Sequence, residues 1–148
     1  MADKVHNVLF LCTGNSARSI MAEVMMNQVS KGIFKAYSAG SRPAGGVNPL
    51  AIETLEAMGF HAAEVRSKSW DEFAAPGVPP IDFIVTVCDN AAAEPCPVWP
   101  GRPATAHWGI DDPAAVQGSA ERKRAAFRDA AEILRERIDL LIGEAAKR

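Results

Sequence analysis

The sequence predicts an α/β domain built on a parallel sheet, because short aliphatic segments alternate with longer segments whose apolar residues recur at helical spacing. The aliphatic segments have the length and β-branched content of buried strands, and turn residues follow them. Strand–helix–strand alternation of this kind forms parallel sheets. Strands are expected at residues 5–11, 34–40, 81–87 and 104–109, and helices at 18–31, 47–60 and 121–146, with a helical turn within 66–73.

Capping residues support the helices. Gly32 follows the first helix, and the second has Asn48 as an expected N-cap, Pro49 in its first turn and Gly59 at its end. The last helix carries one apolar stripe, which we expect to cover the sheet and not to form a dimer seam. The stripe consists of Phe127, Ala131, Leu134, Ile138 and Leu141.

Length and composition indicate a single domain over residues 1–148 in the cytoplasm. A net charge of −2 gives no electrostatic reason to expect nucleic acid or membrane as a partner. No apolar run approaches the ~18 residues of a membrane span, and the amino end lacks the apolar core of a secretion signal. Three cysteines are an odd number, unlike the even sets of secreted disulfide frameworks, so reduced and reactive thiols are expected.

Residues 8–23, VLFLCTGNSARSIMAE, place Cys12 at the end of the first strand, directly before a loop of small and polar residues. Gly14 permits backbone conformations that other residues avoid, and Asn15 tolerates a positive φ better than most. Such a loop can turn its amides inward, and the helix beginning near Arg18 adds a positive dipole end and a guanidinium that grips two oxygens. The residues expected to bind a tetrahedral oxyanion are Thr13, Gly14, Asn15, Ser16, Ala17, Arg18 and Ser19.

Cys12 is the candidate nucleophile at this site. Helix N-termini and nearby cations lower cysteine pKa values from ~8.5 to about 3.5–7.5, so Cys12 is expected to be largely ionised at neutral pH. Ser19 is a candidate donor to the thiolate. The plain alternative is that Cys12 is a small apolar residue ending a buried strand. The glycine, arginine, serine and helix that follow it favour the reactive role.

The segment CTGNSARS resembles the signature loop of the low-molecular-weight protein tyrosine phosphatases and of the arsenate reductases that share their fold. Similar landmarks run from Val8 to about Pro113. The resemblance implies a three-layer, Rossmann-like domain with a four-stranded parallel sheet flanked by helices. It also implies that Cys12 attacks phosphorus or arsenic. Phosphate, sulfate and arsenate are all tetrahedral oxyanions, so the loop does not choose among them.

Two further cysteines favour arsenate reduction. Cys88 follows the strand IDFIVTV and should share the sheet edge of Cys12, and Cys96 lies eight residues later. Thiols that reach one another can exchange disulfides in sequence. The segment CDNAAAEPCP is similar to that of the thioredoxin-coupled arsenate reductases, which implies a relay from Cys12 through Cys88 to Cys96. Thioredoxin or glutaredoxin is then the expected reductant, with no cofactor.

Three alternatives remain open at this stage. A small phosphatase would use Cys12, Arg18 and Asp112 and leave the other thiols idle. A non-enzymatic redox sensor would use the Cys88–Cys96 disulfide as its output. A zinc site could combine the cysteines with His107, although the close Cys-x2–4-Cys pair of structural zinc sites is absent, and we expect no metal.

The expected general acid is Asp112, because the phosphatase family carries its acid in an Asp-Pro pair and Pro113 follows here. A residue before proline is biased toward an extended backbone, which suits an acid aimed at the loop. Asp111 is expected to cap the short turn that follows. Tyrosine phosphatases of this fold tend to have tyrosines after the pair, whereas this chain has AAV.

Some reductase relatives bind potassium beside the cysteine loop through a carboxylate in the segment after the second helix. This chain has RSKS there, so the ammonium of Lys68 is a candidate replacement that would tether Asn15 or neighbouring carbonyls. The alternative is that Lys68 is a solvated surface lysine.

Overall fold

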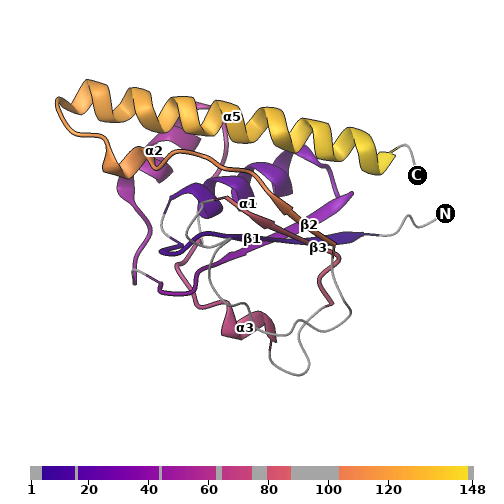
Figure 1. Ribbon diagram of the computed structural model, residues 1–148. Coiled ribbons are helices and arrows are strands. Elements are labelled where there is room, and N and C mark those ends of the chain that lie inside the picture. The colour runs from indigo at the N-terminus through magenta and orange to yellow at the C-terminus, as the bar shows by residue number, and fades with distance from the viewer. Residues whose placement is uncertain are drawn as a thin grey trace.

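The computed structural model describes residues 5–15, 17–43, 45–62, 65–74, 80–87 and 104–146. Within them, four parallel strands form one sheet in the order β2-β1-β3-β4 (Figure 1). The strands are β1 (His6–Leu11), β2 (Phe34–Ala39), β3 (Phe83–Thr86) and β4 (Ala104–His107). The predicted parallel α/β fold is confirmed.

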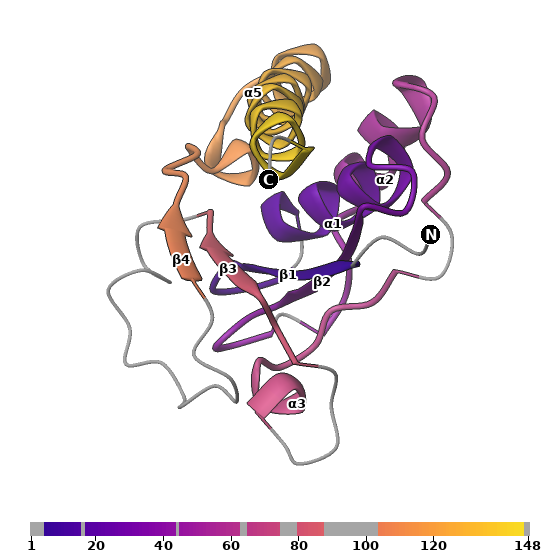
Figure 2. The ribbon, with the colours of Figure 1, turned by 90° about the vertical axis from the view of Figure 1, so that its right-hand side faces the viewer.

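Helices cover both faces of this sheet. On one face lie α1 (Arg18–Val29), α2 (Pro49–Ala57) and the long α5 (Ala120–Ala146), and on the other lies the short α3 (Asp71–Ala74) (Figure 2). The arrangement gives the three layers that were expected. Among the described helices, none is both long and apolar enough to cross a membrane.

The side chains of β1 alternate between the two interfaces, as expected for a strand buried on both faces. Val8 and Phe10 belong to the core cluster beneath α1, α2 and α5, whereas Leu9 and Leu11 pack with Trp70 on the face of α3. The predicted stripe of α5 faces the first cluster. Its members Phe127, Ala131, Leu134 and Ile138 are buried, and Leu141 is partly buried against them.

The ends of α2 follow the capping signals. The side chain of Asn48 accepts a hydrogen bond from the Leu50 amide at 2.9 Å, and Gly59 adopts a φ of 89° after the helix. The first helix stops two residues earlier than predicted. Lys31 itself adopts a left-handed φ of 52°, and Gly32 follows with 91°.

The helical turn expected within 66–73 is shorter, because residues 66–69 are not helical and α3 begins only at Asp71. Instead, Ser69 forms an isolated parallel bridge with Gly40, directly after β2. The amide of Gly40 donates to the Lys68 carbonyl at 2.9 Å, and the amide of Trp70 donates to the Gly40 carbonyl at 2.9 Å. This tertiary pairing, which local propensity does not encode, holds the segment beside the loop that follows β1.

Candidate active site

Because the strands are parallel, their carboxyl ends meet at one edge, and Cys12 lies there, directly after β1. It is buried, and its amide donates to the carbonyl of Ala39 at the end of β2 at 3.2 Å. The backbone of Cys12 is therefore held in place by β2.

Asn15 shapes the loop after Cys12. It is fully buried and adopts a positive φ of 44°, a conformation that asparagine tolerates better than most residues. Its side-chain nitrogen Nδ2 donates to the Ser19 hydroxyl oxygen at 2.8 Å, and its side-chain oxygen Oδ1 accepts from the Lys68 backbone amide at 2.8 Å. Ser19 is also buried. Ser16, another expected loop residue, lies outside the described residues.

The first turn of α1 suits an anion. Ala17 precedes the helix and has no side-chain acceptor for its first amides, and the turn contains no acidic residue. The first N–H groups of a helix lack intrahelical partners and carry the positive end of its dipole. An oxyanion above the loop would accept hydrogen bonds from these N–H groups and would bring negative charge to the positive end of the dipole.

Arg18 joins this turn to the segment of the expected acid. Its Nη1 donates to the Ile110 carbonyl at 2.7 Å, and its Nη2 lies 3.8 Å from Oδ2 of Asp112. The Arg18 side chain is 13% exposed, whereas that of Asp112 is 45% exposed. The structure thus brings together two residues that the sequence singled out at opposite ends of the chain.

Asp112 has the backbone that its proline predicts, with φ −74° and ψ 108°. Its Oδ1 accepts from the Ala114 amide at 3.0 Å and caps the short 3-10 helix η1 (Pro113–Ala115). The capping role expected for Asp111 therefore belongs to Asp112, whose Oδ2 still faces Arg18. One carboxyl group therefore caps its own loop and also lies beside the guanidinium of Arg18.

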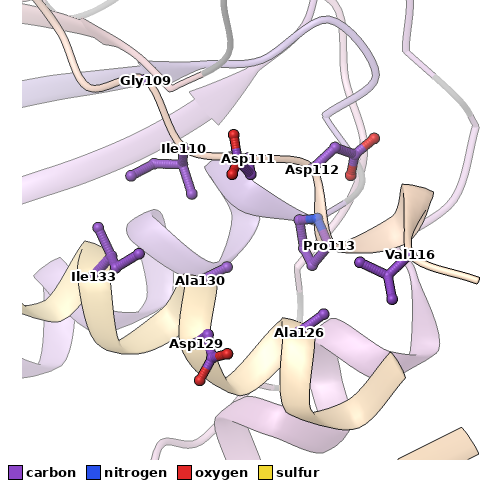
Figure 3. Close-up of a pocket in the computed structure, with 10 residues that line it drawn as sticks. All are labelled: Gly109, Ile110, Asp111, Asp112, Pro113, Val116, Ala126, Asp129, Ala130 and Ile133. Atoms are coloured by element: carbon purple, nitrogen blue, oxygen red, sulfur yellow. The ribbon is translucent and has the colours of Figure 1, made fainter. Parts of the chain in front are cut away.

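A cavity of about 300 Å³ separates this loop from α5. In Figure 3, Ile110 and Pro113 extend toward α5, while the carboxyl group of Asp112 points away from it. The cavity is lined by Gly109, Ile110, Asp111, Asp112, Pro113, Val116, Ala126, Asp129, Ala130 and Ile133.

Gly40 is a site residue that the sequence analysis missed. A Cβ built on it would lie 2.6 Å from the carbonyl oxygen of Cys12 and 3.0 Å from the amide nitrogen of Asn15, and closer still to the carbonyl of Thr13. Only a glycine permits the loop to approach β2 this closely. The available signal was its place at the end of a strand next to the cysteine strand.

The contact with Asn15 that was expected of the Lys68 ammonium is made by a different group of the same residue. The backbone amide of Lys68, and not its ammonium, binds Asn15. The ammonium donates to the Arg66 carbonyl at 2.9 Å and lies 3.7 Å from Oε1 of Glu23. Its side chain is 9% exposed, so the alternative of a solvated lysine is wrong. Burial lowers the pKa of Lys68, and the nearby Glu23 carboxylate opposes that effect.

The two distal thiols, Cys88 and Cys96, lie outside the described residues. The chain just before Cys88 is described: the amide of Val87 donates to the Leu11 carbonyl at 2.9 Å, and its carbonyl accepts from Ile110 at 3.2 Å. At the same edge, Oγ1 of Thr86 lies 2.7 Å from Nδ1 of His107. Among the described residues, no three His, Cys, Asp or Glu side chains are grouped to hold a metal.

The fold and the loop define an α/β protein with a thiol directly after a parallel strand and an arginine at the start of the helix that follows. The profile of the family described as low molecular weight phosphotyrosine protein phosphatase matches residues 7–148. An arsenate reductase of Halalkalibacterium halodurans is 40% identical over 121 residues, which cover 82% of this chain and 84% of that protein. The chain belongs to the low molecular weight phosphotyrosine protein phosphatase family.

Solved structures agree on the fold and differ in activity. An arsenate reductase from Archaeoglobus fulgidus superposes with a TM-score of 0.71 at 32% identity, covering 92% of this chain and 98% of that one. A low molecular weight protein tyrosine phosphatase from T. tengcongensis gives 0.74 at 25% identity, covering 94% and 99%. Because both activities occur on this fold, the reaction has to be argued from the site.

Proposed function

We propose that this protein reduces arsenate to arsenite through Cys12, Cys88 and Cys96. The observation that carries the proposal is the hydrogen bond from Val87 to Leu11, since these residues directly precede Cys88 and Cys12. Two thiols that follow paired parallel strands suit direct exchange between sulfurs. The similarity to arsenate reductases over most of the chain supports the same reaction.

In the first step, arsenate binds above the loop against the first amides of α1 and the Arg18 guanidinium. The Cys12 thiolate attacks arsenic, and Asp112 donates a proton so that an arsenic-bound oxygen leaves as water. The 3.8 Å between Arg18 and Asp112 supports this role, because the acid then lies within reach of an oxygen held by the arginine. Arsenic remains As(V) in the resulting thiol adduct.

In the second step, the Cys88 thiolate attacks the sulfur of Cys12. The electron pair of the sulfur–arsenic bond passes to arsenic, so that arsenite leaves as As(III) and a Cys12–Cys88 disulfide forms. The Cys96 thiolate then attacks Cys88, releasing the Cys12 thiolate and leaving a Cys88–Cys96 disulfide. An external dithiol, for which thioredoxin is our first candidate, reduces this disulfide and closes the cycle.

The decisive experiment compares the wild type with Cys88→Ser and Cys96→Ser. Arsenite is measured in a single turnover without reductant, and then at steady state with thioredoxin or with glutaredoxin and glutathione. We expect no arsenite from Cys88→Ser. Cys96→Ser should release about one equivalent and then fail to turn over with thioredoxin. Full steady-state activity of both variants would overturn the relay.

Hydrolysis of phosphate monoesters is the second candidate function, favoured by the family itself and by the similarity to a tyrosine phosphatase. It requires Cys12, Arg18 and Asp112, and neither distal thiol. Turnover of para-nitrophenyl phosphate by both serine variants at the wild-type rate, together with no arsenite from the wild type, would establish it in place of the reductase. A redox sensor would show neither activity and would oxidise at low peroxide concentration.

A further inference from the structure

Ile110, which directly precedes the two aspartates, links two parts of the sheet edge through its backbone. Its amide donates to the carbonyl of Val87, directly after β3, at 3.2 Å, and its carbonyl accepts from Nη1 of Arg18 at 2.7 Å. A hydrogen bond from a guanidinium is charge-assisted, and such bonds are about twice as strong as neutral ones. The arginine is therefore held by a main-chain carbonyl whose own residue is tied to the end of a strand.

This hydrogen bond sets the direction of the Arg18 guanidinium. The guanidinium is planar and its donors have a fixed geometry, so a contact at Nη1 restricts where Nη2 and Nε point. Nη2 lies 3.8 Å from Oδ2 of Asp112, on the same loop as the Ile110 carbonyl. An arginine that is already held loses less conformational freedom when it binds an anion, and this favours affinity.

The side chain of Ile110 anchors this carbonyl. It is 6% exposed and belongs to the core cluster beneath α1, α2 and α5, and Figure 3 shows it extending toward α5. The packing on this side is incomplete, because the cavity of about 300 Å³ lies between the loop and the helix. When a buried side chain is shortened, its surroundings relax according to the space available to them. Shortening Ile110 beside this cavity should therefore change the position of its carbonyl relative to Arg18.

We infer that Ile110 is a positioning residue for the oxyanion site: its buried side chain holds the carbonyl that aims the Arg18 guanidinium and keeps it beside Asp112. The inference deepens the proposed function, and it rests on the oxyanion site and not on the disulfide steps. It therefore predicts the same behaviour for phosphate and arsenate. A residue that only filled the core would affect stability and leave the arginine unchanged.

The first measurement follows the Arg18 guanidinium by nitrogen NMR of the labelled protein without an anion. A held guanidinium rotates slowly, so we expect separate Nη1 and Nη2 signals in the wild type and one averaged signal in Ile110→Ala. The loss of the signals in Arg18→Lys assigns them. Ile138→Ala is the matched control, because Ile138 is fully buried in the same core cluster on α5. It should lose stability as well, and keep the separate signals.

The second measurement is the affinity for inorganic phosphate, by calorimetry at a temperature where each variant is folded. Ile110→Ala should weaken phosphate binding about tenfold, near the lower end of the range for one hydrogen bond to a charged group. Ile110→Val should stay within about threefold of the wild type, because it removes much less packing than Ile110→Ala. Ile138→Ala should bind phosphate with the wild-type affinity.

Three results would overturn the inference: one averaged Arg18 signal in the wild type, wild-type phosphate affinity of Ile110→Ala, or an equal loss of affinity in Ile138→Ala. If Ile110→Ala does not fold, the wild-type signals decide the question, since they need no substitution. Absence of phosphate binding by the wild type would refute the oxyanion site itself. Failure of the cysteine variants to abolish arsenate reduction would affect the relay alone and leave both measurements intact.

Discussion

The two flanks of the Cys12 loop are built differently. On one flank, Asn15, Gly40 and Lys68 form a buried network of short hydrogen bonds and close backbone contact. On the other flank, Asp112 is 45% exposed and lies 3.8 Å from Arg18. Buried polar networks are costly to leave partly satisfied, whereas exposed ion pairs contribute little to stability. The buried flank thus fixes the shape of the loop, and the exposed flank carries the residues to which we assign the chemistry in the proposed reaction.

The largest expected effect comes from the exposed flank, where a substitution should lower the rate of arsenate reduction and leave the free energy of unfolding nearly unchanged. Asp112→Asn removes the proton that the leaving oxygen needs and should lower single-turnover arsenate reduction by about 10²–10⁴-fold. The amide oxygen can still cap η1, so the free energy of unfolding should change by less than about 0.5 kcal/mol. Asp111→Asn is the matched control and should retain the wild-type rate. Unchanged arsenate reduction by Asp112→Asn would show that this residue is not the acid.

On the buried flank, a substitution that displaces the loop should lower both the free energy of unfolding and the binding of phosphate. Gly40→Ala places a methyl group against the Cys12 and Thr13 carbonyls, so the loop must move away from β2. We expect a loss of about 1–3 kcal/mol in the free energy of unfolding, the usual cost of overpacking, together with loss of phosphate binding. Gly46→Ala is the control, since nothing lies within 4 Å of its added carbon. Equal stability of the two variants in urea denaturation would contradict the close approach.

The third prediction concerns the pKa of the Cys12 thiol, which lies between the two flanks. The uncapped first turn of α1 and Arg18 favour the thiolate, so we expect the pKa of Cys12 to lie below the ordinary value of a cysteine. Alkylation by iodoacetamide at different pH values measures it in the Cys88→Ser/Cys96→Ser background, where Cys12 is the remaining thiol. A midpoint above about 8 would contradict the expectation.

The smallest effect concerns the exposed pair of Arg66 and Glu72. The hydrogen bonds from Arg66 lower the pKa of Glu72, so this carboxyl stabilises the fold above its unfolded pKa, and the contribution is lost as pH falls through the lowered value. Glu72→Gln should therefore cost less than about 1 kcal/mol at neutral pH and nothing in acid, because both side chains are largely solvated. Urea denaturation across this acid range at low and high salt measures the difference. A cost that grows on acidification would reverse the sign and refute the assignment.

Much of the fold was predictable because its signals are local. The Asn48 cap and the glycine after α2 determine that helix with no reference to the rest of the chain. The positive φ of Asn15 likewise agrees with the tolerance of asparagine for this conformation. The extended segment before α3 was not, since its conformation depends on pairing with Gly40, a strand end far away in the sequence.

The same division holds for the candidate site. The sequence selected Cys12, Arg18 and Asp112 from strand ends and an Asp-Pro pair, and the described geometry brings the last two together. It did not indicate that Asp112 would also cap η1. Either of two adjacent aspartates can cap a turn, and residue type alone does not distinguish them. The sequence analysis also missed Gly40 and Glu23, because a glycine after a strand and a glutamate in a helix are common and do not by themselves indicate a site.

The sequence by itself determined a strand, a loop and a helix that place a thiol and an arginine close together along the chain. Residue type, capping and periodicity act over a few neighbours and suffice for that unit. Only the tertiary structure decided what surrounds it: Arg18 reaches a carbonyl 92 positions away, and Asn15 binds an amide 53 positions away. Contacts at such separations depend on how the sheet and its helices pack, and packing is a property of the whole chain.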